Sequence, residues 1–410
     1  MLFTFVAQNG NMNLSYYCFD QKTIIKMNPK DFSNPSSGTS ILTHAGYWAF
    51  LPAPLPPDIN WSLPLVSALA DAERDLSKLT TLAGSFPFPR LLIQPFLRRE
   101  AVLSSRIEGT RATLTDLYAY ESAQISFLEP GNDVREVYNY VRALEYGLER
   151  VKTLPVSLRL IREIHAKLME GVRGGNLTPG EFRRSQNWIG AIGSTPSTAT
   201  YVPPPVEEMN LGLDQLEKFI HSGSEIPALV RAGLIHYQFE AIHPFLDGNG
   251  RIGRLLMVLL FCEWSLLPQP LLNLSVYFER YRQEYYDLLL STSQKGTWEA
   301  WLRFFLRGVS VQASESLVRL DRLQTIRTSY QSLADAERNA RRMEQVLDFL
   351  FMQPILSVRQ VQMFLGVSFP IAQRYIDRLV SAGILQEVTG QARNRVFRAN
   401  EIFQALEGLA

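Results

Sequence analysis

The chain of 410 residues has few of the residues that build disulfide frameworks or metal clusters. It holds two cysteines, Cys18 and Cys262, and five histidines, none of them in an H-E-x-x-H pattern. Two cysteines provide neither a set of disulfides nor a four-ligand zinc site. The net charge is only +1, which argues against a broad surface for binding polyanions.

Long apolar runs are missing as well. The longest, residues 255–262, is far shorter than the ~20 residues that a membrane-spanning helix needs. The first residues lack the charged segment and apolar core of a secretory signal. With 46% hydrophobic and 20% charged residues, the composition is that of a globular protein. We therefore expect a cytoplasmic protein that does not bind a membrane.

One short segment, residues 243–254, is dense in reactive side chains. Apolar residues at helical spacing on both sides predict two buried helices joined by a tight polar loop. Gly248 and Gly250 allow the loop backbone to adopt a positive φ and to approach a ligand closely. The amides of such a loop, at the start of a helix, form a binding site for an anion.

The side chains of this loop are those that a nucleotide phosphate site needs. Arg251 and Arg254 are three residues apart, so both guanidinium groups can reach one phosphate chain. Asp247 is the only acid of the loop and is suited to hold Mg²⁺ beside phosphate oxygens. His243 can accept a proton from a hydroxyl group. The glycine spacing also matches the dinucleotide-binding fingerprint, but a predicted helix precedes it where that fingerprint requires a strand.

The segment resembles the active-site motif of Fic domains, H-P-F-x-[DE]-G-N-[GK]-R-x-x-R, at every specified position. Most Fic proteins transfer AMP from ATP to a Ser, Thr or Tyr hydroxyl of a target protein and release pyrophosphate. The resemblance implies that His243 is the general base and that Asp247 binds Mg²⁺. It also implies that Asn249 and the glycine amides cradle the phosphates. Arg251 and Arg254 would then clamp the β and γ groups.

A second element that resembles this family lies upstream, in residues 104–109. Ser104 and Glu108 fit the pattern [ST]-x-x-x-E-[GN] of the inhibitory helix, and their spacing places them on one helical face. Gly109 is suited to end that helix. The resemblance implies that Glu108 pairs with Arg254 in the resting state, which misaligns ATP for transfer.

Two further segments resemble parts of the Fic family, but their sequence patterns are less specific than the active-site motif. Residues 182–205 combine alternating apolar residues with glycines, which predicts a short exposed hairpin, the flap of the family. Ile189 and Gly190 of this flap are expected to dock the target as an added strand and to present its hydroxyl to the general base. The resemblance places Tyr285 and Tyr286 near the adenine, although aromatic residues at this spacing are more often part of a core.

The fold class that follows is mainly α: a Fic-type helical bundle with a small β-hairpin flap, followed by a C-terminal winged helix-turn-helix domain. The sequence predicts five segments: a weakly ordered N-terminal arm (1–45), a helical region with the inhibitory helix (46–150), the Fic catalytic core (151–310), a helical linker (311–340) and the winged-helix-like domain (341–410).

The prediction of a winged helix rests on the order of elements in the last 70 residues. This order is three helices, at 343–352, 358–365 and 369–382, and then two strands, at 384–389 and 395–398. Ser368 is expected to cap the third helix. Four arginines could contact DNA phosphates: Arg374, Arg378, Arg393 and Arg395. Because eight arginines stand against six acids, docking of a protein or formation of a homodimer is favoured over DNA binding.

Three hypotheses follow for the function. The leading one is an autoinhibited protein adenylyltransferase that uses ATP and Mg²⁺ and modifies an unidentified target protein or itself. The second is the transfer of another nucleotide group, or the removal of AMP, on the same scaffold. The third is a DNA-binding regulator that senses nucleotides. The intact His243 argues against the third, because sensing requires no general base.

Overall fold

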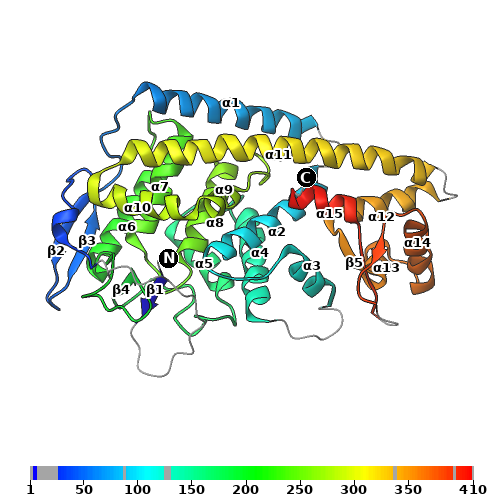
Figure 1. Ribbon diagram of the computed structural model, residues 1–410, viewed down its shortest axis with the longest axis horizontal. Coiled ribbons are helices and arrows are strands. Elements are labelled where there is room, and N and C mark those ends of the chain that lie inside the picture. The colour runs from blue at the N-terminus through cyan, green and yellow to red at the C-terminus, as the bar shows by residue number, and fades with distance from the viewer. Residues whose placement is uncertain are drawn as a thin grey trace. The chain divides into compact units, whose positions relative to one another are not determined.

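The structure is a computed structural model that describes residues 3–6, 26–85, 89–123, 131–335, 339–390 and 394–408. Within these ranges it is mainly helical with three small antiparallel sheets, which confirms the predicted fold class at this level (Figure 1). No helix of the described ranges is long and apolar enough to cross a membrane. The chain divides into two compact units, and four helices contribute residues to both: α1 (Leu63–Ser85), α4 (Asn132–Arg150), α9 (Leu274–Arg280) and α11 (Trp298–Asp335).

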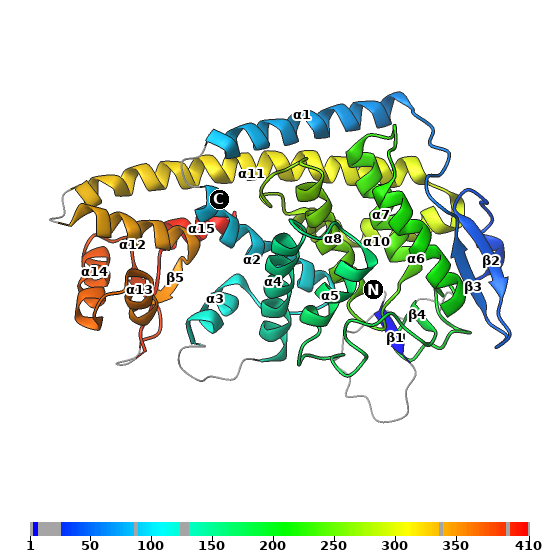
Figure 2. The same cartoon turned by 180° about the vertical axis from the view of Figure 1, so that it is seen from behind.

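The first unit is drawn from residues 1–71, 146–264 and 280–308 and contains the polar loop. Helices α6, α7 and α8 of this unit lie side by side, with α7 in contact with both others (Figures 1 and 2). Besides its shares of α1, α4, α9 and α11, its elements are β1 (Phe3–Val6), a 3-10 helix (Pro29–Asp31), β2 (Gly38–Leu42), β3 (Trp48–Pro52), α5 (Leu158–Leu168), β4 (Asn187–Gly190), α6 (Val206–His221), α7 (Ala228–Ile242), α8 (Asn249–Glu263) and α10 (Arg282–Lys295).

Helix α7 is buried on nearly every face. Leu234, Ile235 and Phe239 have no exposed surface. Gly233 lets Phe305 approach so closely that a Cβ at the glycine would lie 3.0 Å from its ring. Burial of each large apolar side chain stabilises the fold by about 1.5–3 kcal/mol. This packing fixes the end of α7, where the polar loop begins.

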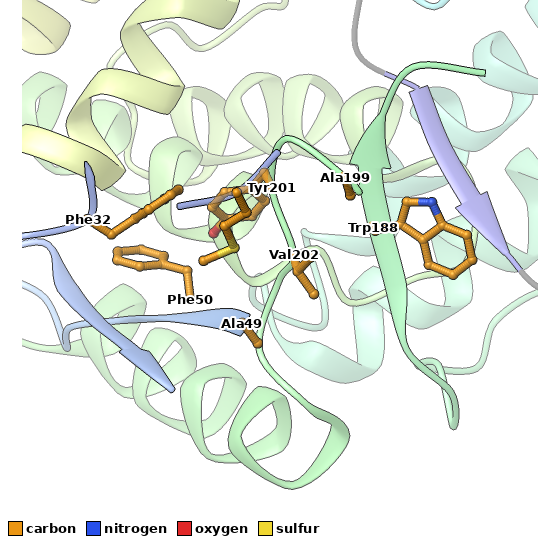
Figure 3. Close-up of a cluster of buried hydrophobic side chains, with 8 residues drawn as sticks. Phe32, Ala49, Phe50, Trp188, Ala199, Tyr201 and Val202 are labelled. Atoms are coloured by element: carbon orange, nitrogen blue, oxygen red, sulfur yellow. The ribbon is translucent and has the colours of Figure 1, made fainter. Parts of the chain in front are cut away.

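The small sheets of this unit meet the segment 182–205 in a shared core. Strands β2 and β3 form an antiparallel hairpin, and the N–H of Phe50 in β3 donates to the carbonyl of Val202 (2.8 Å). The rings of Phe32 and Phe50 lie 5.2 Å apart, and Tyr201 packs on both (Figure 3). The flap segment therefore belongs to a folded core.

Part of the segment expected to be a weakly ordered arm, residues 1–45, also belongs to this core. Met27 is buried, and its N–H donates to the carbonyl of Ala199 (2.7 Å). Residues 38–40, which the composition predicts as loop, form part of β2 because the hairpin pairs them with β3. Residues 7–25 of the predicted arm lie outside the described residues.

The second unit is drawn from residues 72–145, 265–279 and 309–410. Helix α2 packs against α12 and α15, and a partly buried ion pair joins Arg98 of α2 to Glu121 of α3 (2.8 Å). Besides its shares of α1, α4, α9 and α11, its elements are α2 (Pro89–Ile107), α3 (Leu114–Ala123), α12 (Ala340–Met352), β5 (Ile355–Ser357), α13 (Val358–Leu365), α14 (Phe369–Ser381), β6 (Gln386–Glu387), β7 (Val396–Arg398) and α15 (Asn400–Glu407).

The C-terminal part of this unit differs from the sequence-based expectation in four details. The strands β6 and β7 are shorter than predicted, and a further strand, β5, gives the sheet order β5-β7-β6. A further helix, α15, follows β7. Ser368 stands at the start of α14 but makes no capping bond with its side chain, whereas Ser357 and Gln360 form a capping box at α13. A three-residue strand such as β5 carries too little periodicity to be predicted.

Candidate active site

The loop between α7 and α8 contains two residues in the left-handed conformation. His243 follows α7 with φ 51° and ψ 62°, and Gly248 precedes α8 with φ 82°. This conformation is unusual for a histidine and turns the chain away from the helix. Glycine adopts it without steric cost. A Cβ at Gly248 would also lie 3.1 Å from the sulfur of Met169.

Helix α8 begins at Asn249, so its first amides belong to the loop. The first N–H groups of a helix have no carbonyl partner within it, and they carry the positive end of the helix dipole. Gly250 belongs to the first turn of this helix and does not have the positive φ that the sequence allows for it; of the two glycines, only Gly248 does. The amides of residues 249–251 thus lie at a helix start, where anions bind in other proteins, and the binding of an anion here stays a prediction.

The imidazole of His243 is oriented by its own helix. It is 4% exposed, and its Nδ1 lies 3.2 Å from the carbonyl oxygen of Glu240. Because a carbonyl only accepts hydrogen bonds, Nδ1 carries the proton and Nε2 carries the lone pair. This is the tautomer that a general base requires.

Buried polar side chains hold the backbone of the loop. Asn249 binds both backbone groups of Phe245, since its Oδ1 accepts from the N–H and its Nδ2 donates to the carbonyl, each at 2.8 Å. Asn187, the first residue of β4, donates to the carbonyls of His243 (3.1 Å) and Phe245 (2.8 Å). The side chain of Asn249 thus closes the loop, whereas the resemblance implies a contact with phosphate.

Arg183 is a second residue of the flap segment that holds the loop, and sequence reasoning gives it no role. Its Nε donates to the carbonyl of His243 (3.1 Å), and its other nitrogens donate to the carbonyls of Ser185 and Pro204. Burial lowers the pKa of Arg183 to about 10, so the side chain keeps its charge at neutral pH. With Asn187, it couples the flap to the backbone of the histidine.

His165 of α5 supports the acidic residue of the loop. Its ring stacks on Phe245 with 3.7 Å between centroids. Its Nδ1 accepts from the N–H of Gly180 (2.9 Å), so the proton is on Nε2, which donates to the carbonyl of Asp247 (3.0 Å). Burial lowers the pKa of His165 to about 4, and the ring is neutral at pH 7. The amphipathic pattern of α5 gives no sign of this contact.

Asp247 and Arg251 meet at the start of α8. The guanidinium of Arg251 lies 3.4 Å from Oδ1 of Asp247, and the same oxygen accepts from the N–H of Gly248 (2.6 Å). The backbone of Gly174 passes close to the other oxygen, because a Cβ there would lie 2.4 Å from Oδ2. The carboxylate is 34% exposed. One accessible carboxylate beside a phosphate site fits the way in which proteins hold Mg²⁺.

Among the residues that the structure describes, no group of three or more His, Cys, Asp and Glu side chains is arranged to hold a metal ion. Mg²⁺ at nucleotide sites is held by one or two carboxylates together with phosphate oxygens. The donor set around Asp247 is therefore compatible with Mg²⁺ only when the phosphates are bound as well.

Arg254 is buried one turn further along α8 and is 1% exposed. Next to it, Gly253 leaves room for Glu240, because a Cβ at Gly253 would lie 2.3 Å from the Glu240 carboxylate. The carbonyl of Gly253 is 3.2 Å from Nδ1 of His236. Burial and the charge of Arg254 lower the pKa of His236 to about 3. Both arginines of the motif are thus fixed in a buried setting.

Tyr285 and Tyr286, which the resemblance places near the adenine, lie in different surroundings. Tyr285 is 1% exposed, its hydroxyl is 2.7 Å from Nε2 of His236, and its ring lies 6.1 Å from that of Trp301. It is part of the core, which is the alternative that its spacing favours. Tyr286 is partly exposed under the guanidinium of Arg282, and its contact with a base stays a prediction.

The flap differs from the exposed hairpin that the sequence predicts. Its return is a single antiparallel bridge between Ile189 of β4 and Tyr201. Trp188 is 5% exposed because it packs in the core that the hairpin β2–β3 shares, and Gly190 is buried as well. The other edge of β4 is paired with β1. Ile189 and Gly190, whose docking role stays a prediction, therefore already have a strand beside them.

Ser104 and Glu108 lie in the second unit, at the end of α2. Ser104 is fully buried, and Glu108 is partly exposed. The helix ends at Ile107, and the N–H of Glu108 donates to the carbonyl of Ser105 (3.0 Å). Gly109 has φ 103°, in agreement with its predicted role at the helix end. The spacing predicts that Glu108 lies on the same helical face as Ser104. In the structure Glu108 instead occupies the turn that follows the helix, one residue after its end.

Comparison with known families agrees with this site. Residues 155–261 match the Fic/DOC family, and residues 66–149 match the N-terminal region of the Fic/DOC family. The chain contains a Fic domain. The polar loop lies within the matched residues, so the family assignment and the geometry refer to the same segment.

The relatives of this Fic domain carry the name of an enzyme. Protein adenylyltransferase Fic of Drosophila grimshawi is 27% identical over 205 residues, and that of Drosophila erecta is 29% identical over 205 residues. These matches cover 48% of this chain and 38% and 37% of the two relatives. The chain thus spans well under half the length of the relatives that it matches.

Solved structures show the same fold. A Fic family protein from Desulfovibrio desulfuricans G20 gives a TM-score of 0.52 at 18% identity, over 84% of this chain and 98% of that protein. Fic-1 of C. elegans gives a TM-score of 0.50 at 22% identity, over 63% of this chain and 74% of the other. At these identities the likeness concerns the fold alone.

Proposed function

We propose that this Fic domain transfers AMP from ATP to a hydroxyl group of a protein. The observation that carries the proposal is the state of His243, whose Nδ1 donates to Glu240 while Nε2 bears the lone pair beside an anion-binding helix start. The adenylyltransferase relatives support this chemistry at the level of the family.

In the proposed reaction the oxygen of a Ser, Thr or Tyr hydroxyl attacks the α-phosphorus of ATP. His243 takes the hydroxyl proton on Nε2 while the new P–O bond forms. The bond between the α-phosphorus and the oxygen that bridges to the β-phosphorus breaks in line, and pyrophosphate leaves with that electron pair. The imidazolium then returns its proton to water.

The residues of the loop would hold the phosphate chain in position. The first amides of α8 and the guanidinium groups of Arg251 and Arg254 supply donors and positive charge. Asp247 would hold Mg²⁺, which neutralises phosphate charge when bound. The exposed carboxylate of Asp247 and the small Gly174 beside it fit this role. His165 keeps the backbone of Asp247 in place.

Glu108 is the brake in this proposal. Its sequence pattern with Ser104 is that of the inhibitory helix of the family, and the residue is partly exposed in the turn after α2. A pair between Glu108 and Arg254 would withdraw one guanidinium from the phosphate chain and add a negative charge beside it. ATP would then bind with its α-phosphorus out of line with the hydroxyl.

For the C-terminal residues 341–410 we propose a winged helix that docks protein, including a second copy of this chain. Large apolar side chains are exposed on its helices, among them Met363 (71%) and Phe369 (47%). Exposed apolar groups favour a protein partner over a phosphate backbone. Three exposed arginines lie on α14 and before β7: Arg374, Arg378 and Arg395. Arg393 lies outside the described residues. Retardation of duplex DNA at low salt would contradict this assignment.

The test of the proposed function uses α-labelled ATP, Mg²⁺ and a cell lysate. We expect Glu108→Gly to label protein strongly, the wild type weakly, and Glu108→Gly with His243→Ala not at all. Glu170→Gly is the matched control for loss of an acid in a turn, and it should behave as the wild type. Equal labelling by the wild type and Glu108→Gly would contradict the brake. Silence of Glu108→Gly with every nucleotide would contradict transfer.

A further inference from the structure

The strand β1 pairs with β4, where the sequence predicts that a target segment docks as an added strand, on the edge of β4 that does not face Tyr201. The two strands pair antiparallel over four residues, from Phe3 opposite Gly190 to Val6 opposite Asn187. Figure 3 shows β1 running alongside β4 at Trp188. Asn187 is also the residue whose side chain donates to the backbone of His243. A segment docked on β4 therefore lies on the strand that is bonded to the general base.

The backbone groups that β4 offers to this neighbour can be assigned from its other contacts. Both backbone groups of Ile189 are bonded to Tyr201, because its N–H donates to the Tyr201 carbonyl (2.8 Å) and its carbonyl accepts from the Tyr201 N–H (3.0 Å). Alternate residues of a strand direct their backbone groups to opposite edges. The edge that faces β1 is therefore built from Trp188 and Gly190.

An edge of this kind binds extended peptides regardless of their side chains. Open N–H and carbonyl groups on a strand edge are a template for a further strand, and strand addition gives affinity through the main chain. A target segment would use the same backbone groups of Trp188 and Gly190 that β1 uses. The two segments exclude each other because one edge accepts one strand.

We propose that Phe3–Val6 is an internal competitor for the target-docking edge of β4. A target segment must displace this strand before its hydroxyl can reach His243. Because the strand belongs to the same chain, it competes at an effective concentration on the order of mM. The inference rests on the proposed function, and it adds a control of target docking that leaves nucleotide binding untouched. It is thus separate from the brake at Glu108.

The register gives a matched pair of variants. Phe5 lies opposite Trp188, so its N–H faces β4, whereas Thr4 lies opposite Ile189 and directs its N–H away. Proline removes the N–H at its own position. Phe5→Pro should therefore release the strand, and Thr4→Pro should leave the main-chain bonds to β4 in place. Deletion of residues 1–6 is the strongest variant.

Two measurements test the competitor. In the Glu108→Gly background, Phe5→Pro and the deletion should raise the labelling of lysate proteins about tenfold, and Thr4→Pro should not. A synthetic peptide of residues 1–10 added to the deletion variant should lower its labelling again. By hydrogen exchange, the amides of Trp188 and Gly190 should be protected in the full chain and exposed in Phe5→Pro.

The outcomes separate this inference from the proposed function. Equal labelling by Phe5→Pro and Thr4→Pro in an active Glu108→Gly protein would overturn the competitor while AMP transfer stands. Unchanged exchange at Trp188 and Gly190 on Phe5→Pro would overturn it as well. If Glu108→Gly transfers no label, the proposed function fails, and hydrogen exchange alone still decides whether β1 occupies the edge.

Discussion

The polar loop at residues 243–254 and the helices α13 and α14 both depart from the usual distribution of side chains, in opposite directions. In the loop, Arg251 and Arg254 are buried to 3% and 1% exposure. On α13 and α14, Met363 and Phe369 are 71% and 47% exposed. Burying an ion costs several kcal/mol, so such charges are kept where they perform chemistry. Exposed apolar groups cost little stability and favour contact with a partner.

The largest expected effect is the loss of AMP transfer when His243 of the polar loop is replaced. His243→Ala in the Glu108→Gly background should lower AMP transfer by about 10²–10⁴-fold, because the hydroxyl proton has no acceptor. The measurement is the initial rate of label transfer. His221→Ala, at an exposed position of α6, is the control. A decrease of similar size in the control would show that the loss is not specific to the loop.

Acid should weaken the first unit through the buried histidines beside the loop. In the unfolded chain a histidine takes up a proton near pH 6.5, whereas the folded-state pKa values of His165 and His236 are lowered to about 4 and about 3. Their contribution to stability is therefore complete above pH 6.5 and is lost as the pH falls toward 4. The slope is about 1.4 kcal/mol per pH unit for each histidine.

The midpoint of thermal unfolding, recorded from pH 7 to pH 5, measures this loss. His165→Gln should give a flatter profile than the wild type, since one of the two groups no longer titrates. His221→Gln, on the surface of α6, should keep the wild-type slope. A wild-type midpoint that stays constant over this range would contradict the assignment of two neutral buried rings.

A smaller effect is expected from the glycine that packs beside Arg254. Gly253→Ala places a Cβ 2.3 Å from the Glu240 carboxylate, which must move, and 3.3 Å from the ring of His236, so it should cost about 1 kcal/mol of unfolding free energy. Gly212→Ala in α6 is the matched change, because its Cβ would meet Ile242 at an ordinary 3.4 Å. It should stabilise by about 0.4–1 kcal/mol. Chemical denaturation of both variants checks the difference in sign.

The smallest change in stability is expected on the exposed face of α13. Met363→Ser removes an apolar side chain that is already 71% exposed, so the unfolding free energy should stay within about 0.5 kcal/mol of the wild type. If this face docks a second copy of the chain, the same variant should shift light scattering toward a smaller assembly. A larger loss of stability would show that Met363 packs in the core, which would contradict its assignment to an exposed docking face.

Much of the candidate site can be predicted from sequence because it is local. The loop has its two flanking helices and its helix-start amides where the spacing predicts them, and of the two glycines only Gly248 is left-handed. The role of Tyr285 could not be predicted in this way, because it depends on residues that are distant in the sequence. A buried aromatic and a ligand-binding aromatic share the same helical spacing, and only the neighbours His236 and Trp301 show that this ring is in the core.

The sequence by itself determined which side chains the candidate site contains, since the proposed general base, the predicted anion-binding turn and both arginines lie within twelve consecutive residues. Only the tertiary structure decided what holds them. Arg183, Asn187 and His165 reach the loop from 56 to 82 residues away. The pairing of β1 with β4 is likewise known only from the tertiary structure. The reason is physical: bonds to backbone carbonyls and amides can be made by many residues, so they leave no pattern in the sequence.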